Sequence, residues 1–136
     1  MSASNKSQLA IGLGCQAECS AEALRALIDA SLAEQGLSLA QVGGLACIER
    51  RRDTPGLHAL AAELGLPLVF FTAAQLQPFD AQLSHRSALA FKHTGCHGVA
   101  ESAALALAAQ LNAGTARLLI PYRKSRQATF ALASAG

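Results

Sequence analysis

Residues 44–71 have the sequence GLACIERRRDTPGLHALAAELGLPLVFF, and this stretch decides the fold class. The apolar run Gly44–Ile48 predicts a buried strand. The dipeptide Thr54-Pro55 predicts the start of a helix, because threonine caps helices and proline is favoured at the first helical position. Gly65–Pro67 ends that helix, and Leu68–Phe71 predicts the next strand. A strand, a helix and a strand in this order favour a right-handed crossover and parallel pairing.

The same alternation continues on both sides of this stretch. Before it, Gln8–Leu13 predicts a strand, and Ser20 predicts the N-cap of a helix that ends at Gly36. After it, we expect one helical turn at Ala73–Leu76 ended by Pro78, helices at Ser84–Thr94 and Gly98–Leu111, and strands at Arg117–Ile120 and Ala128–Ala133. The short connection Tyr122–Gln127 between these two strands predicts a hairpin and a mixed sheet.

The predicted fold class is therefore α/β. We expect a single three-layer domain over residues 1–136, with a mixed, mostly parallel sheet of about five strands flanked by helices. Residues 1–7 are polar, and we expect them to be disordered. The apolar fraction is 51% while aromatic residues reach only 4%, which favours close packing of small side chains between helices and sheet.

Composition also limits location and partners. The chain has no charged-then-apolar leader and no apolar run of membrane-spanning length, so we expect a cytoplasmic protein with no membrane partner. Its four cysteines are then expected to be reduced thiols. Their spacing, with His97, matches no closed zinc pattern, so neither a metal nor a cofactor is expected. The net charge of +2 and the absence of an aromatic ladder argue against a nucleic-acid partner.

Basic residues gather in two runs that give the best ligand signal. More than half of the 11 lysines and arginines lie in them, at Arg50, Arg51, Arg52, Arg123, Lys124 and Arg126. The first run, with Asp53, directly follows a buried strand, and open sheets bind ligands at such strand ends. Arginine binds carboxylates through two parallel hydrogen bonds. Each run alone is equally compatible with a solvated surface, but together they predict a site for a ligand with several carboxylates.

The segment Gly12–Ala17 reads GLGCQA and only partly matches a dinucleotide-binding pattern, because the following helix is expected near Ser20 and not inside the motif. We interpret it as a tight strand-to-helix turn that needs glycine. Backbone N–H groups at Gly14 and Cys15 can still contact an anionic ligand there. Cys15 is also a candidate nucleophile, since it precedes a helix N-terminus.

These segments together resemble the CobE family of cobalamin-biosynthesis proteins, whose domain also forms the C-terminal part of the CbiG proteins. The resemblance runs from about Leu9 to Ala133 and rests on Gly12–Cys15, Ser20–Glu22, Glu49–Leu57, Gly95–Leu105 and Leu118–Lys124. It implies a role in corrin-ring synthesis, where CbiG-type proteins open a δ-lactone in cobalt-precorrin-5A and release acetaldehyde. Intermediates of that stage carry many carboxylates, in agreement with the arginine runs. The family tends to have a lysine where this chain has Arg50–Arg52.

Three functions remain open. The first, which we rank first because no catalytic constellation is complete, is binding of a precorrin or corrinoid intermediate by Gly14, Cys15, Asp53 and the two basic runs. The second is hydrolysis of a precorrin lactone, with Glu101 or His97 as the general base. The third is a scaffold that docks on another cobalamin-pathway enzyme through the alanine-rich helix at Ala100–Ala109.

Overall fold

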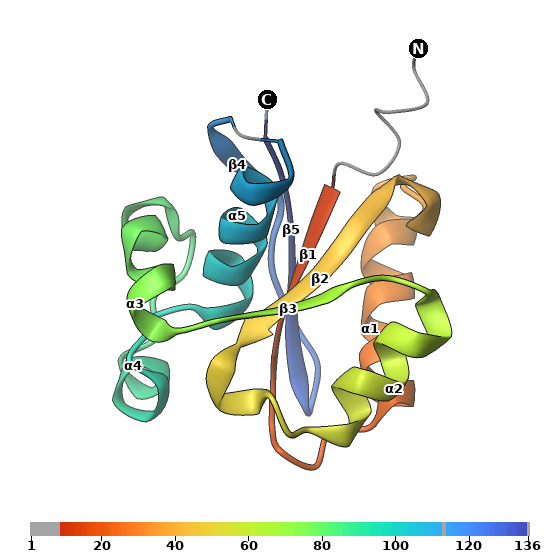
Figure 1. Ribbon diagram of the computed structural model, residues 1–136, viewed down its shortest axis with the longest axis horizontal. Coiled ribbons are helices and arrows are strands. Elements are labelled where there is room, and N and C mark those ends of the chain that lie inside the picture. The colour runs from red at the N-terminus through yellow and green to blue at the C-terminus, as the bar shows by residue number, and fades with distance from the viewer. Residues whose placement is uncertain (1–8, 113, 136) are drawn as a thin grey trace.

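The computed structural model describes residues 9–112 and 114–135, so the expectation for residues 1–7 lies outside the described residues. A five-stranded sheet forms its centre, in the order β3-β2-β1-β5-β4 (Figure 1). The strands are β1 (Leu9–Cys15), β2 (Val42–Ile48), β3 (Leu68–Phe71), β4 (Ala116–Lys124) and β5 (Ala128–Ala135). β1, β2 and β3 are parallel, and β5 is antiparallel to both β1 and β4. Four of the five strands therefore share one direction, which confirms a mixed, mostly parallel sheet.

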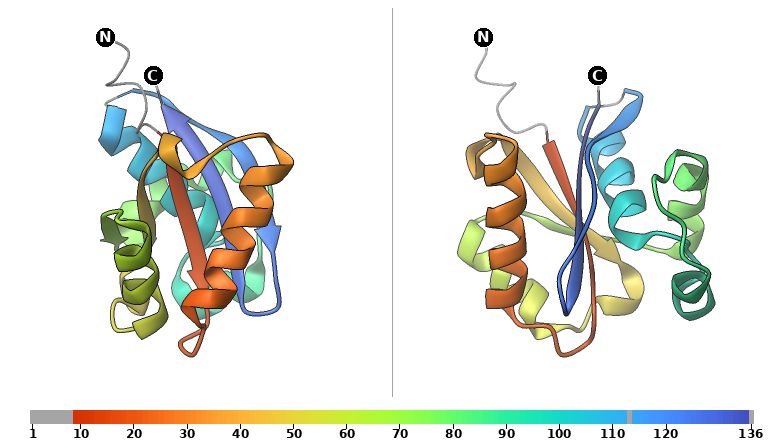
Figure 2. Two further views of the ribbon diagram at one scale, coloured as in Figure 1. Left: turned by 90° about the vertical axis from the view of Figure 1, so that its right-hand side faces the viewer. Right: turned by 180° about the vertical axis from the view of Figure 1, so that it is seen from behind.

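Helices cover both faces of the sheet, as the α/β prediction requires. α1 (Ala21–Glu34) and α2 (Pro55–Leu64) lie on one face, and α3 (Ala73–Leu76), α4 (Ala88–Thr94) and α5 (Val99–Asn112) lie on the other (Figures 1 and 2). Three short 3-10 turns connect elements: η2 (Leu39–Gln41), η3 (Glu49–Arg51) and η4 (Gln77–Gln82). None of the helices in the described residues is long and apolar enough to cross a membrane.

The predicted ends of α1 and the start of α2 are confirmed. Ser20 Oγ accepts a hydrogen bond from Ala23 N at 3.1 Å, as an N-cap does. At the other end Gly36 has a φ of 67°, and Leu37 N donates to Leu32 O at 3.0 Å, which closes the helix. The helix α2 begins at Pro55, directly after Thr54.

Three predicted boundaries were wrong. The helix expected from Ser84 begins only at Ala88, because Ser87 caps it and the residues before it make other bonds. The helical turn predicted at Ala73–Leu76 is confirmed as α3, but Pro78 does not end the helical conformation, since proline fits the first positions of the 3-10 turn η4 that follows directly. β4 continues through Lys124, so residues 125–127 alone connect it to β5.

The glycines of the GLGCQA segment lie within β1, and the interpretation as a turn was wrong. A Cβ atom on Gly12 would lie 1.9 Å from Ala100 O and 2.5 Å from Ala104 N of α5. A Cβ atom on Gly14 would lie 2.5 Å from Thr129 Oγ1. Gly12 is therefore required by the close approach of α5 to the sheet, and Gly14 by the Thr129 side chain on β5. This packing places the N-terminus of α5 beside the carboxyl end of β1.

The same packing removes the docking face that the sequence suggested on α5. Its alanines from Ala100 to Ala108 are buried in the core of the described residues, against the sheet. A partner protein therefore cannot use that face while the domain is folded.

Candidate functional site

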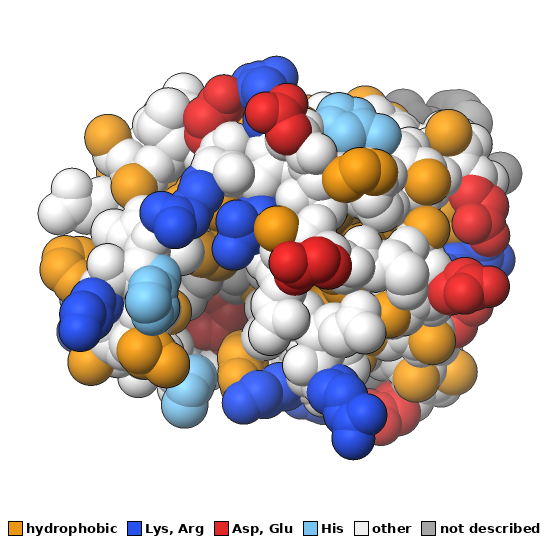
Figure 3. All heavy atoms as spheres, turned by 90° about the horizontal axis from the view of Figure 1, so that it is seen from below, with side chains coloured by type: hydrophobic (Ala, Val, Ile, Leu, Met, Phe, Trp, Pro, Cys, Tyr) orange, Lys and Arg blue, Asp and Glu red, His pale blue; other side chains and the backbone are white. Residues whose placement is uncertain are grey.

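A cleft of about 430 Å³ lies at the carboxyl ends of β1 and β2. Its walls come from those strand ends, η3, α4, the first residues of α5 and the turn between β4 and β5. Figure 3 shows this end of the molecule, where basic and histidine side chains surround a hollow. Open α/β sheets characteristically bind ligands at this position.

The structure brings together most of the residues that the sequence singled out. Eight of the eleven line the cleft: Gly14, Cys15, Arg50, Arg51, His97, Glu101, Lys124 and Arg126. Arg52, Asp53 and Arg123 are not among the lining residues.

Three of the lining cations have no partner within the described residues. Arg50, Lys124 and Arg126 are exposed and make no hydrogen bond, ion pair or ring contact there. Arg50 comes from η3, and the other two come from the end of β4 and the hairpin turn. The cleft thus has unpaired positive charge on two of its walls, η3 and the hairpin of β4 and β5. This charge is available to an anionic ligand.

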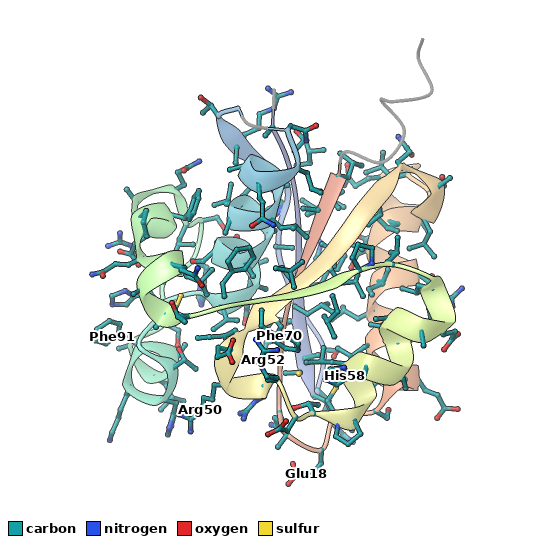
Figure 4. The ribbon with its side chains drawn as sticks, in the orientation of Figure 1. Glu18, Arg50, Arg52, His58, Phe70 and Phe91 are labelled. Carbon is teal, nitrogen blue, oxygen red and sulfur yellow. The ribbon has the colours of Figure 1, made fainter. Side chains whose placement is uncertain are left out.

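The two predicted cations outside the cleft are already occupied. Arg52 Nε lies 2.6 Å from Glu49 Oε2, and its guanidinium carbon lies 4.9 Å from the centre of the Phe70 ring. Figure 4 shows Arg52 beside Phe70, with Arg50 apart from them. Arg123 Nε lies 3.4 Å from Glu34 Oε1 on α1. We therefore interpret these two arginines as surface residues that pair with other side chains outside the cleft.

Glu101 is a buried carboxylate that ties three segments together. Its side chain is 1% exposed. Oε1 accepts from Ser84 N at 2.8 Å, and Oε2 accepts from both Ser84 Oγ and Tyr122 N, the latter at 2.8 Å. Both oxygens are thus occupied by the segment before α4 and by β4. This arrangement holds two walls of the cleft against α5 and leaves little capacity for accepting a proton from water.

His97 has the geometry of an oriented imidazole. Its Nδ1 lies 3.0 Å from Asp80 Oδ1, so that the Nδ1–H donates to the carboxylate and Nε2 is the remaining nitrogen. The ring stacks on Phe91, with 4.5 Å between the centroids. Asp80 also pairs with Arg86 at 2.7 Å. Sequence reasoning missed Asp80, because it lies 17 positions before His97 and in no motif.

Sequence reasoning also missed the apolar wall of the cleft. Leu89 and Ala90 of α4 line it, together with Val99 of α5. Leu89 is 66% exposed and Phe91 is 48% exposed, although large apolar side chains are normally covered. In the sequence, the available signal for this wall was the presence of two large apolar residues, Leu89 and Phe91, on a short helix that ends at a glycine.

Cys15 is the thiol nearest to the cleft. A hydrogen bond from Cys47 and the nearby Arg51 charge lower the pKa of the Cys15 thiol, although burial opposes them. The hydrogen bond to Cys15 and burial raise the pKa of Cys47 well above its usual value. Arg51 Nε also donates to Cys15 O at 2.7 Å. Within the described residues, no three His, Cys, Asp or Glu side chains are grouped to hold a metal ion.

Comparison with known proteins gives consistent matches over nearly the whole chain. The family model described as the cobalamin synthesis G C-terminus matches residues 9–133. Protein CobE of Sinorhizobium sp. is 36% identical over 126 residues, which cover 92% of this chain and 79% of that protein. The crystal structure of CobE, a protein from the cobalamin (vitamin B12) biosynthetic pathway, has a TM-score of 0.89 and 47% identity, covering 93% of this chain and 89% of that one.

A longer protein contains the same domain as one part. The cobalt-precorrin-5A hydrolase of Priestia megaterium is 34% identical over 125 residues, which cover 92% of this chain. The match spans only 32% of the hydrolase itself. About two thirds of that protein therefore have no counterpart in the present alignment.

Proposed function

The chain belongs to the cobalamin-biosynthesis family defined by the cobalamin synthesis G C-terminus, and we propose that its cleft binds a polycarboxylate precorrin or corrinoid intermediate. The observation that carries this proposal is the set of unpaired cations around the cleft. Arg50, Lys124 and Arg126 have no partner within the described residues, whereas Arg52 and Arg123 are paired outside it. Unpaired guanidinium and ammonium groups are the expected contacts for peripheral carboxylates.

The other walls of the cleft support the same ligand class. Leu89, Ala90 and Val99 give an apolar surface for the body of a ring. Gly98, directly before α5, and the first two residues of α5, Val99 and Ala100, also line the cleft, and a helix N-terminus favours negative charge. At about 430 Å³ the cleft is within the usual range of small-molecule sites, so a larger ring would be held along part of its edge.

The experiment is a titration of wild type and variants with a precorrin intermediate of the ring-contraction stage, followed by its absorbance spectrum. The test variant combines Arg50→Ala, Lys124→Ala and Arg126→Ala. Its matched control combines Arg52→Ala and Arg123→Ala, which remove cations outside the cleft. At about 1 kcal/mol for each partly exposed contact, the test variant should weaken binding roughly a hundredfold. The control should bind within about twofold of wild type.

Two results would contradict the proposal. One is equal affinity of the test variant and wild type. The other is a loss of binding free energy in the control that reaches two thirds of the loss in the test variant, in proportion to the two and three cations removed. The second result would indicate attraction by net charge alone, without a site. Ligand mass, followed in the same mixtures, distinguishes binding from turnover.

A second candidate function is hydrolysis of a lactone in such an intermediate, and the His97–Asp80 contact favours it. A carboxylate that accepts from Nδ1–H keeps Nε2 free to take a proton from water, as in known general bases. Between the two bases that the sequence suggested, this geometry supports His97 over Glu101, whose oxygens both accept internal hydrogen bonds. Turnover that Asp80→Asn lowers and His97→Ala abolishes would support hydrolysis. Unchanged turnover in His97→Ala would exclude this base.

A further inference from the structure

Arg51 also lines the cleft, and its side chain is held differently from those of the exposed cations. It is the last residue of η3, and its side chain is half-buried. Its Nε donates a hydrogen bond to Cys15 O at the carboxyl end of β1, with 2.7 Å between the two atoms. One end of the guanidinium group is therefore fixed to the backbone of the central strand.

The hydrogen bond to Cys15 O decides which donors of Arg51 are left for a ligand. A guanidinium group is planar and carries its N–H donors in a fixed arrangement, so holding Nε orients the whole group. Within the described residues, Nη1 and Nη2 of Arg51 make no hydrogen bond or ion pair. These two nitrogens form the edge of the group that still offers two parallel N–H bonds, the arrangement that a carboxylate accepts.

The exposed cations of the cleft lack this constraint. Arg50, Lys124 and Arg126 make no contact within the described residues that would fix their orientation. Each of these long side chains loses rotational freedom when it contacts a ligand, whereas folding has already restricted Arg51. Mobile charge attracts an anion in many orientations, but a fixed guanidinium edge accepts a carboxylate in one.

We propose that Arg51 is the specificity-determining contact of the cleft, an inference that rests on the binding function proposed above. Nη1 and Nη2 bind one carboxylate of the ligand through two parallel hydrogen bonds, while the exposed cations attract the remaining carboxylates. The ligand must then present a free carboxylate that reaches the carboxyl end of β1. Arg51 fixes the orientation of the ligand, and the other cations contribute mainly to its attraction.

The first test compares two exchanges of arginine for lysine, which keep the charge and remove the planar guanidinium group. Arg51→Lys is the test variant, and Arg50→Lys, at the exposed neighbour in the same 3-10 turn, is the matched control. Both are titrated at several ionic strengths with the precorrin intermediate used to test the binding function. Arg51→Lys should weaken binding roughly tenfold or more at every ionic strength, because a charged hydrogen bond is lost while the charge is unchanged. Arg50→Lys should bind within about twofold of wild type.

A second measurement observes the contact directly in the wild-type chain, by NMR of isotope-labelled arginine. The side-chain signals of Arg51 are assigned through their correlations to its backbone, so this readout remains available if Arg51→Lys fails to fold. On addition of the intermediate, the Nη–H signals of Arg51 should become separate and exchange more slowly with water, since bound Nη groups no longer rotate. A role of Arg51 confined to tying η3 to β1 would leave these signals unchanged.

Two results would overturn this inference while the binding function stands. One is binding by wild type without any change in the Nη–H signals of Arg51. The other is an equal effect, or no effect, of Arg51→Lys and Arg50→Lys on the affinity. A wild-type chain that does not bind the intermediate would overturn both proposals, so the two failures are distinguished.

Discussion

The substitution Glu101→Gln tests whether the buried carboxylate acts as a structural tie or as a catalytic base. The amide has the same shape as the carboxylate but carries no charge and has one acceptor fewer. If its oxygen takes the place of Oε2, the bonds from Ser84 Oγ and Tyr122 N are kept. The amide NH₂ then faces Ser84 N–H, which donated to Oε1 at 2.8 Å. One hydrogen bond is lost and donors face each other inside the protein.

The magnitude follows from these contacts. A lost hydrogen bond to a charged group costs about 1.5–3 kcal/mol, and a buried unpaired donor costs about 1–3 kcal/mol. Removing a buried charge offsets part of this cost, because that charge no longer has to be kept out of water. We expect a net loss of about 2 kcal/mol in the free energy of unfolding. For a domain of this size that corresponds to a Tm lower by about 8 °C.

Thermal and urea unfolding, followed by circular dichroism, measure this loss. The matched control is Glu18→Gln, which makes the same chemical change at an exposed side chain and should alter the free energy of unfolding by less than about 0.5 kcal/mol. Figure 4 shows Glu18 at the periphery of the molecule. Equal stability of Glu101→Gln and wild type would refute the structural role, and loss of turnover in such a stable variant would restore Glu101 as a base.

Three further predictions follow from packing, thiol chemistry and charge. Gly12→Ala should destabilise the fold by about 3 kcal/mol or more, because the new methyl group meets the backbone of α5. Gly44→Ala should cost less, because the leucine side chain that its methyl group meets at 3.2 Å can move. Thermal unfolding of the two variants measures the difference. The lowered pKa of Cys15 means that its iodoacetamide reaction rises with pH at lower values than for free cysteine, and Cys47→Ala should move that rise to higher pH by removing the hydrogen bond. Ligand affinity should fall with added salt, and the slope should flatten in Arg126→Ala, as measured by titration at several ionic strengths.

Much of the fold was predictable because its signals are local. The Thr54-Pro55 start of α2 and the Ser20 and Gly36 ends of α1 depend on residues within one helical turn. The start of α4 was not predictable from local signals. Ser84 is kept out of the helix by its hydrogen bonds to Glu101, which lies 17 positions later in the chain. The requirement for Gly12 likewise comes from α5, almost ninety residues away, so the segment looked like a turn.

The distinction between local signals and contacts of distant residues also applies to the candidate site. The two basic runs could be identified from charge and from their position after a strand. The sequence identifies only some of the cations that are paired. Glu49 lies three positions from Arg52, a spacing that suggests an ion pair, whereas Glu34 lies 89 positions from Arg123 and gives no such signal. The His97–Asp80 contact has no local signature at all, because η4 and the segment before α5 meet only in the folded chain.

Two separate groups of residues form the cleft: one group sets its shape, and the other lines it with unpaired charge. This separation explains which substitutions the site can accept. Gly12 sets the distance between α5 and β1, and Glu101 fixes two walls through backbone N–H groups, so both positions tolerate little change. The unpaired cations at Arg50, Lys124 and Arg126 depend on no internal partner within the described residues. Exchange between arginine and lysine there alters ligand contacts without affecting the fold. An arginine in the Arg50–Arg52 run, where the family tends to have a lysine, is therefore compatible with the same architecture and with the anionic ligand that we propose.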